Sequence, residues 1–367
     1  MSDLSILFEP VKLGPITLPN RWAMAPMTRQ FSPNRTPTED VARYYQRRAE
    51  GGTGLIITEG TTLRDLASSG SDAIPAISGE VPVAGWAKVV EAVHAAGSKI
   101  FPQIWHMGVM RDAEASGHPE VETLSPSGLL LPGKERGRAM TDAEVAQSIE
   151  DFAEAARNAQ AAGFDGIELH GAHGYLIDQF FWEGTNTRTD QYGGDMVART
   201  RFACEVIRAV RAAVGPDYPI MLRYSQWKQQ DFESKLAPTP EALEAFLAPL
   251  TDAGLDAYHC STRRYWEPEF EGSNLNLAGW TKKLTGLATV TVGSVGLNQD
   301  FVSTYASEET VGTTDIDGLA ERVSAGEFDV VAVGRALIAT PDWPKLVQAG
   351  RLGDAATYSR TQLAELV

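Results

Sequence analysis

Several features that define other classes of protein are missing from this sequence. The chain of 367 residues has two cysteines, Cys204 and Cys260, too few for a disulfide framework or a four-cysteine iron–sulfur site. No run of 18 apolar residues occurs, and the first residues lack the basic and apolar regions of a signal peptide. We therefore expect a cytoplasmic protein that needs neither a membrane nor an iron–sulfur cluster.

Positive charge is also scarce. The chain carries 48 acidic against 32 basic side chains, and its formal net charge of -16 repels nucleic acid and anionic lipid surfaces. Apolar residues make up 43% and charged residues 22%, a composition that excludes disorder, collagen and coiled coil and suits a globular protein with a sizeable core. We expect no nucleic-acid partner and no membrane partner.

Short apolar runs that end in polar or glycine residues alternate along the chain with stretches of helical periodicity. Strands are predicted at residues 22–28, 54–59, 99–106, 166–170, 219–225, 257–261, 289–293 and 330–334. Helices are predicted between them at residues 38–50, 83–96, 141–162, 196–214, 240–253 and 317–325. Thr141 with Glu144 forms a capping-box pattern, and Thr239 before Pro240 is a second helix start.

This alternation, with no linker or change of composition, favours one closed (β/α)8 TIM barrel over two doubly wound domains. The whole chain, residues 1–367, is therefore predicted to form a single domain. Residues 11–19 place a Gly-Pro turn between two short apolar runs, which predicts a β-hairpin that closes the barrel floor. Two long connections, residues 107–140 and 262–288, are expected to flank the active-site mouth.

The residues that close the predicted strands carry the functional signal, because barrel enzymes gather their chemistry at the carboxyl ends of the strands. His170, His173 and Tyr175 fall within six residues after one strand. An imidazole N–H can bond a carbonyl oxygen, and a phenol can deliver a proton. The alternative is that one histidine bonds a backbone carbonyl while the other faces solvent.

A phosphate site is predicted where the last two strands end, at Gly293 with Ser294 and at Gly334 with Arg335. Barrels often bind phosphate there through backbone N–H groups, and an arginine adds a charge-assisted contact. Glycine after a strand also serves simply to permit a turn, so these residues alone leave both interpretations open.

Two other functional classes remain open from the residues alone. Four histidines close predicted strands, which also suits a metal-dependent hydrolase barrel: His106, His170, His173 and His259. Against it, no His-x-His pair ends the first strand, and the last strand ends on Gly-Arg instead of a carboxylate. A barrel that only binds a ligand is the third class, and turnover alone distinguishes it.

The sequence resembles the Old Yellow Enzyme family of flavin-dependent ene-reductases along nearly its whole length. The matching segments are residues 7–11 with 18–21, 24–29, 44–45 with 48–49, 57–61, 103–108, 170–176 and 186–194. The motifs HGAHGYL at 170–176 and NTRTDQYGG at 186–194 are the most specific of these. The resemblance implies a barrel that holds FMN noncovalently and uses NAD(P)H as hydride donor, with no resident metal.

Matched residue by residue, the family pattern implies a full set of cofactor contacts. Pro26, Met27 and Thr28 would lie along the flavin, Gly60 would touch it through its backbone, and Gln103 with Arg223 would bond the pyrimidine edge. The phosphate would lie against Gly293, Ser294, Gly334 and Arg335. A cation at the position of Arg223 also has a physical reason apart from the resemblance, because it would stabilise the negative charge of a reduced flavin.

For the chemistry, the resemblance implies hydride transfer through FMN to an α,β-unsaturated carbonyl compound. His170 and His173 would hold the substrate's carbonyl oxygen, and Tyr175 would protonate the α-carbon. Trp105 would pack in the substrate pocket or serve as a core aromatic beside the flavin. Since many members of the family dimerise, a homodimer is one expected assembly.

Three departures from the family pattern limit what the resemblance carries over. Gly70 falls where many members place a pocket tyrosine, so that side of the pocket is expected to be open or filled differently. Residues 226–231 replace a short turn, and residues 263–272 are similarly distinctive. In the latter, Arg263 and Arg264 would bind an anionic group or pair with neighbouring glutamates.

Overall fold

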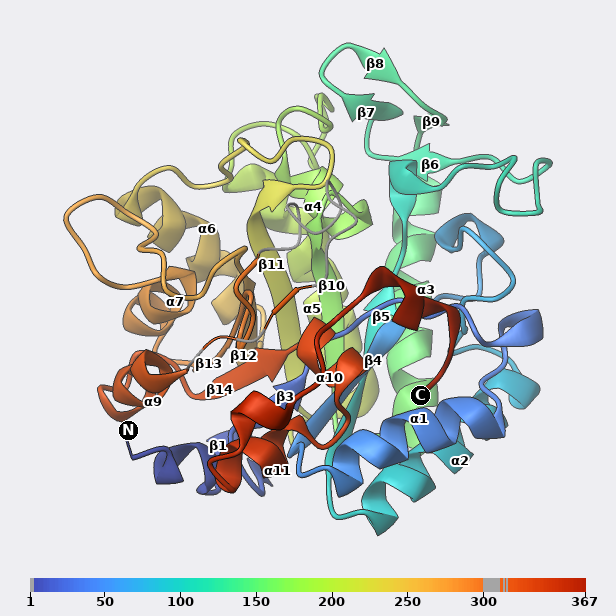
Figure 1. Cartoon of the computed structure of the whole chain (residues 1–367). Helices are drawn as coiled ribbons and strands as arrows, with labels where there is room; N and C mark the ends of the chain where they lie inside the picture. Colours follow the sequence, from blue (N-terminus) through green and yellow to red (C-terminus); the bar gives the residue numbers. More distant parts are fainter. Residues whose placement is uncertain (1–2, 300–310, 313, 315) are drawn as a thin grey trace.

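The computed structural model describes residues 3–299, 311–312, 314 and 316–367, and its centre is a closed barrel of eight parallel strands. In barrel order from the amino-terminal side, they are β3 (Trp22–Met24), β4 (Leu55–Thr62), β5 (Lys99–Trp105), β10 (Ile167–His173), β11 (Ile220–Lys228), β12 (Ala257–Ser261), β13 (Ala288–Val292) and β14 (Val330–Val333). Figure 1 shows helices arranged around the outside of these strands. The predicted TIM barrel is confirmed.

Each long helix follows a strand and packs its apolar face on the barrel. They are α1 (Glu39–Glu50), α2 (Glu80–Ala95), α3 (Asp142–Ala161), α5 (Arg201–Val214), α6 (Pro240–Asp252), α7 (Leu277–Thr285) and α9 (Asp317–Ser324). Shorter helices are α4 (Leu176–Phe181), α10 (Arg335–Ala339) and α11 (Trp343–Gln348). Both predicted helix starts are confirmed, since Thr141 and Glu144 form the capping box and Thr239 caps α6. None of the described helices is both long and apolar enough to cross a membrane.

The barrel floor is closed by the predicted hairpin, which pairs β1 (Val11–Leu13) with β2 (Ile16–Leu18). Leu13 and Leu18 are fully buried and pack with side chains from the amino-terminal halves of the strands, such as Phe101 and Met221. Because this apolar layer fills the lower barrel, a cavity for a ligand is left to the opposite, carboxyl end of the strands.

The strand ends differ from the predicted ones at functionally important places. The first strand ends at Met24 instead of residue 28, since Pro26 has no N–H to contribute to the ladder. β10 continues to His173 and β11 to Lys228, and these two residues are register partners. The segment 226–231, which replaces a short turn of the family pattern, therefore begins as an extension of β11.

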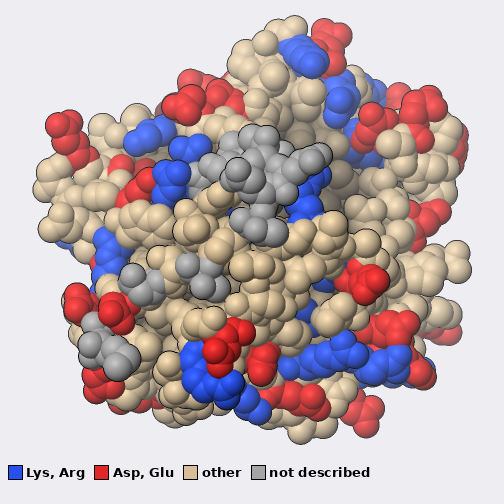
Figure 2. All heavy atoms as spheres, in the orientation of Figure 1, with Lys and Arg blue, Asp and Glu red and all other residues tan. Residues whose placement is uncertain are grey.

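The two long connections rise from the carboxyl side of the barrel, and each lines the cavity there, through Met107 and Arg263 respectively. The first contains four short strands, β6 (Leu124–Ser125), β7 (Leu129–Leu131), β8 (Lys134–Glu135) and β9 (Arg138–Ala139), which stand at the top of Figure 1. On the face drawn in Figure 2, the described Lys and Arg residues occur in small groups interspersed with Asp and Glu.

Candidate active site

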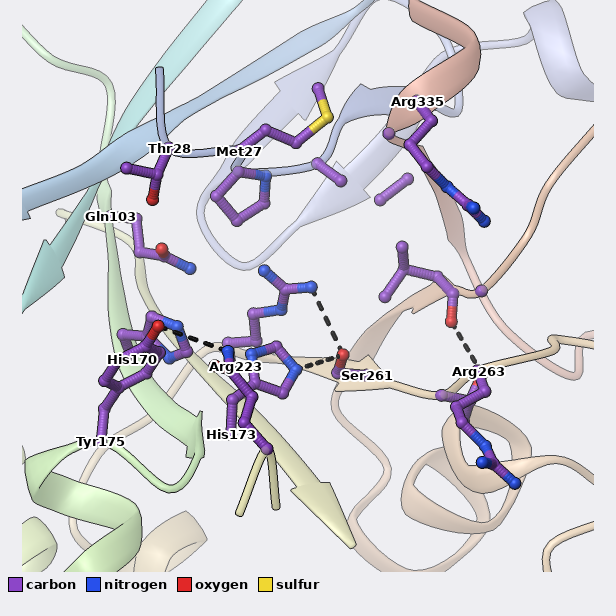
Figure 3. Close-up of a pocket in the computed structure, with 18 of the residues that line it drawn as sticks. Met27, Thr28, Gln103, His170, His173, Tyr175, Arg223, Ser261, Arg263 and Arg335 are labelled. Atoms are coloured by element: carbon purple, nitrogen blue, oxygen red, sulfur yellow. Dashed lines mark hydrogen bonds between the residues drawn. The ribbon is translucent and has the colours of Figure 1, made fainter. Parts of the chain in front are cut away.

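A cavity of about 880 Å³ opens at the carboxyl ends of the barrel strands, within the range of roughly 300–1,000 Å³ typical of cofactor and small-molecule sites. All but one of the residues expected at the site line it. They are Pro26, Met27, Thr28, Gln103, Trp105, His170, His173, Tyr175, Arg223, Gly293, Ser294, Gly334 and Arg335. Figure 3 shows His170 and Tyr175 on one side of the cavity and Arg335 on the other, with Arg223 between them.

The exception is Gly60, which does not line the cavity. A Cβ built on Gly60 would lie 2.2 Å from Cε3 of Trp105, so the indole ring lies directly over this glycine. Trp105 itself lines the cavity and makes an edge-to-face contact with Tyr175, with ring centroids 4.8 Å apart. The role of Gly60 in this structure is therefore to admit the Trp105 ring.

Arg223 brings a buried positive charge to the cavity. One of its terminal nitrogens donates to Ser261 Oγ at 3.3 Å, while its Nε is buried without a partner in the described structure. The same Ser261 hydroxyl lies 2.8 Å from His173 Nε2. Sequence reasoning missed Ser261, because a serine that closes an apolar strand carries no motif.

The two histidines are neutral imidazoles in this environment. Burial, reinforced by the nearby Arg223 guanidinium, holds the pKa of His170 and of His173 well below its ordinary value. His170 Nδ1 accepts the Ala172 N–H at 3.4 Å, which assigns the ring proton to Nε2. His170 can therefore donate one hydrogen bond from Nε2 without carrying a charge.

Beneath Arg223 lies a buried acid–histidine pair. Glu168 Oε2 is 2.6 Å from His259 Nδ1, and both side chains are fully buried. The other carboxylate oxygen of Glu168 accepts from Gln103 Nε2 at 2.7 Å. This contact fixes the orientation of the Gln103 amide, because only its NH2 group can donate to the carboxylate.

The segment 25–30 runs along the cavity and is held by a buried carboxylate. Glu59 Oε2 accepts the backbone N–H groups of Arg29 at 2.8 Å and Gln30 at 3.0 Å. Burial raises the pKa of Glu59 to about 7, against the opposing effect of these two donors. Thr28, immediately before this anchor, lines the cavity.

The opposite end of the cavity has the predicted combination of exposed backbone and positive charge. Gly293 and Ser294 both have positive φ values, 151° and 52°, and Ser294 Oγ lies 3.4 Å from a terminal nitrogen of Arg335. A Cβ on Gly334 would lie 3.5 Å from Met27 Sδ, so Gly334 keeps its part of the cavity free of side-chain atoms.

The residues that depart from the family pattern lie at or beside the cavity. The space beside Gly70 is taken by Met107, whose Sδ would lie 2.8 Å from a Cβ at that glycine. Arg264 forms an ion pair with Glu267 at 2.7 Å, which is the glutamate pairing that the sequence left open. Arg263 lines the cavity instead. Trp227, from the extension of β11, stacks on His173 with centroids 4.6 Å apart.

The strand-end histidines do not form a metal cluster. His106 Nδ1 accepts the Gly108 N–H, and His259 Nδ1 is paired with the Glu168 carboxylate. Within residues 3–299, 311–312, 314 and 316–367, no group of three or more His, Cys, Asp or Glu residues is placed to hold a metal ion.

Comparison with known proteins decides between the remaining classes. Residues 6–353 match the model of the NADH:flavin oxidoreductase / NADH oxidase family. The chain belongs to this family. As a member of the Old Yellow Enzyme family it is an oxidoreductase, so the metal-dependent hydrolase and the barrel that only binds a ligand are both wrong.

Individual relatives cover almost the whole chain. A chanoclavine-I aldehyde reductase of Penicillium roqueforti is 35% identical over 94% of this chain and 89% of its own length. The 12-oxophytodienoate reductase 2 of Arabidopsis thaliana is 35% identical over 93% and 88%. Among solved structures, morphinone reductase in complex with tetrahydroNAD is 30% identical, with a TM-score of 0.79 over 97% of this chain and 93% of that one. An Old Yellow Enzyme homologue from Zymomonas mobilis is 28% identical, with a TM-score of 0.77 over 98% and 99%.

Proposed function

We propose that this enzyme binds FMN along the cavity and uses hydride from NAD(P)H to reduce the C=C bond of α,β-unsaturated carbonyl compounds. The observation that carries the proposal is the gathering of His170, His173 and Tyr175 on one side of a cavity that has Arg223 at its centre. We also propose that the chain acts as a single domain, and a cavity lined by residues from Ala25 to Leu363 supports this.

The donor set fits FMN at both ends of the cavity. Arg223 has a buried Nε with no protein partner in the described structure, as expected for a cation that faces a ligand's pyrimidine edge beside Gln103. Gly293, Ser294, Gly334 and Arg335 are suited to a phosphate, because they combine accessible backbone with a guanidinium. Pro26, Met27 and Thr28 line the cavity and would lie along the flavin ring system. When bound, FMN supplies the hydride relay between the nicotinamide donor and the substrate.

His170 and His173 are proposed to bind the substrate's carbonyl oxygen. As hydride reaches the β-carbon, negative charge builds on that oxygen, and donors already in place stabilise it without reorganisation. Neutral imidazoles suit this role, since a donor N–H is present over the whole physiological pH range. The names of the relatives, an aldehyde reductase among them, support a carbonyl-bearing substrate.

Tyr175 is proposed to complete the reduction by protonating the α-carbon. Its ring centroid lies 4.9 Å from that of His170, so its hydroxyl and the imidazole serve the same part of the cavity. The phenol gives up its proton and recovers one from solvent. Trp105, held over Gly60, orients the Tyr175 ring by its edge-to-face contact.

The experiment compares two acceptors on the holoenzyme after anaerobic reduction by NAD(P)H. Tyr175→Phe should slow reoxidation by 2-cyclohexenone, which needs a proton on carbon, and leave reoxidation by a quinone nearly unchanged. Equal loss with both acceptors would contradict the assignment of Tyr175 as the acid.

A further inference from the structure

The segment Trp227 to Gln230, the distinctive stretch after Arg223, contacts the turn that carries His173 and Tyr175 at every one of its residues. Trp227 stacks on His173, and Gln229 Nε2 donates to Tyr175 Oη at 3.3 Å. Gln230 Nε2 donates to the Gly174 carbonyl at 3.2 Å. The Lys228 side chain reaches α4, the helix that follows this turn.

Lys228 forms a completely buried ion pair with a residue of α4. Its Nζ lies 2.5 Å from Asp178 Oδ1, and both side chains are 0% exposed. The other oxygen, Asp178 Oδ2, accepts the Gly174 N–H at 2.7 Å. Burial raises the pKa of Asp178, and the Lys228 ammonium opposes that effect and keeps the carboxylate available to accept.

The turn held by this pair has an unfavourable backbone. His173 and Gly174 both lie in the left-handed region, with φ values of 64° and 78°. Few residues other than glycine adopt such a φ, although histidine does so more readily than most, and the conformation costs of order 1–3 kcal/mol. His173 is held further by its N–H, which donates to Ser225 Oγ at 3.0 Å, while Ser225 Oγ donates to the Trp227 carbonyl at 2.7 Å.

We propose that Lys228 and Gln229 are positioning residues for the protonation step. Lys228 holds Asp178, which accepts the Gly174 N–H and so fixes the left-handed turn between His173 and Tyr175. Gln229 orients the Tyr175 hydroxyl. In the proposed step, the Tyr175 hydroxyl, held by the hydrogen bond from Gln229, gives its proton to the α-carbon of the substrate. The O–H bond of Tyr175 breaks as the new C–H bond forms, and water returns the proton. This inference rests on the proposed function of Tyr175.

The test measures both half-reactions of the holoenzyme by anaerobic stopped flow. Lys228→Met should slow reoxidation by 2-cyclohexenone about 10- to 100-fold, since small misplacements of a reacting group have effects of that size. Gln229→Leu should slow it about 3- to 10-fold, the loss of one hydrogen bond. Reduction by NAD(P)H and reoxidation by a quinone should change less than about twofold. Lys235→Met, which removes an exposed charge from the same region, is the matched control and should match wild type.

A double-mutant comparison separates positioning of Tyr175 from a general structural effect. In the Tyr175→Phe background, adding Lys228→Met should slow the enone step no more than about threefold further, because the group being positioned is already gone. The inference would be overturned if Lys228→Met slowed the enone step by the same factor in the Tyr175→Phe background as in wild type. It would also be overturned if Lys228→Met slowed reoxidation by the quinone and by the enone equally. Where Lys228→Met does not yield folded holoenzyme, the paired change Lys228→Gln with Asp178→Asn carries the same prediction without leaving a buried charge.

The same experiments distinguish failure of the proposed function from failure of the positioning role. If wild type is not reoxidised by enones, or Tyr175→Phe has no selective effect, the proposed function is wrong. If both behave as proposed and the Lys228 and Gln229 variants reoxidise like wild type with 2-cyclohexenone, only the positioning role is wrong.

Discussion

Replacing His173 by alanine separates two consequences that the structure assigns to this residue. Loss of one donor to a developing oxyanion slows the chemical step by about 10²- to 10³-fold, or about 2.7–4 kcal/mol. Independently, alanine adopts a φ of 64° less readily than histidine or asparagine, which lowers stability by a fraction of the roughly 1–2 kcal/mol that this conformation costs an L-residue. The first effect appears in the rate of enone reduction, and the second in thermal unfolding.

His173→Asn is the matched control, because asparagine tolerates the left-handed backbone and keeps an N–H donor. We expect its enone step to stay within about tenfold of wild type, while His173→Ala loses 10²-fold or more. The assays are anaerobic stopped flow with prereduced enzyme and thermal unfolding of each variant. The reasoning is refuted if His173→Ala transfers hydride to enones at the wild-type rate, or if NAD(P)H oxidation falls equally.

Three further predictions concern the cofactor site and its supports. Arg223→Ala should weaken FMN binding and lower the flavin's midpoint potential, and an unshifted potential at full occupancy would remove the proposed contact. Gly60→Ala should force Trp105 to move, because the new Cβ would lie 2.2 Å from its ring, and a crystal structure with unmoved Trp105 would refute this. Burial raises the pKa of Glu59 from 4.5 to about 7 in the folded state, so stability is highest below the unfolded value and falls as pH rises through about 7. Between pH 5 and pH 8 the free energy of unfolding, measured with urea, should therefore fall more in wild type than in Glu59→Gln, by on the order of 3 kcal/mol. An equal fall in both proteins would contradict this prediction.

The barrel was predictable because each strand is a short apolar run with a polar end, and the alternation with amphipathic helices leaves few architectures. The start of α3 was also predictable, because the capping box of Thr141 and Glu144 depends only on residues three positions apart. Strand ends were less predictable. β11 continues through Lys228 only because Asp178, 50 residues away, neutralises its charge, and no local pattern shows that partner.

The residues of the candidate site were likewise only partly predictable from the sequence. His170, His173 and Tyr175 form a compact motif, and their gathering at one cavity follows from the fold. Ser261 and the Glu168–His259 pair were missed, because their significance lies in contacts between strands. The backbone contact of Gly60 with the flavin stays a prediction, and the close approach of the Trp105 ring to this glycine had no signal in the sequence.

The central claim is tested most directly by the visible absorption spectrum of the purified protein during two anaerobic additions. The account predicts flavin bands that bleach with NADPH or NADH and return when 2-cyclohexenone is added. A protein that stays colourless after reconstitution with FMN, or whose bleached flavin is not reoxidised by the enone, would contradict it.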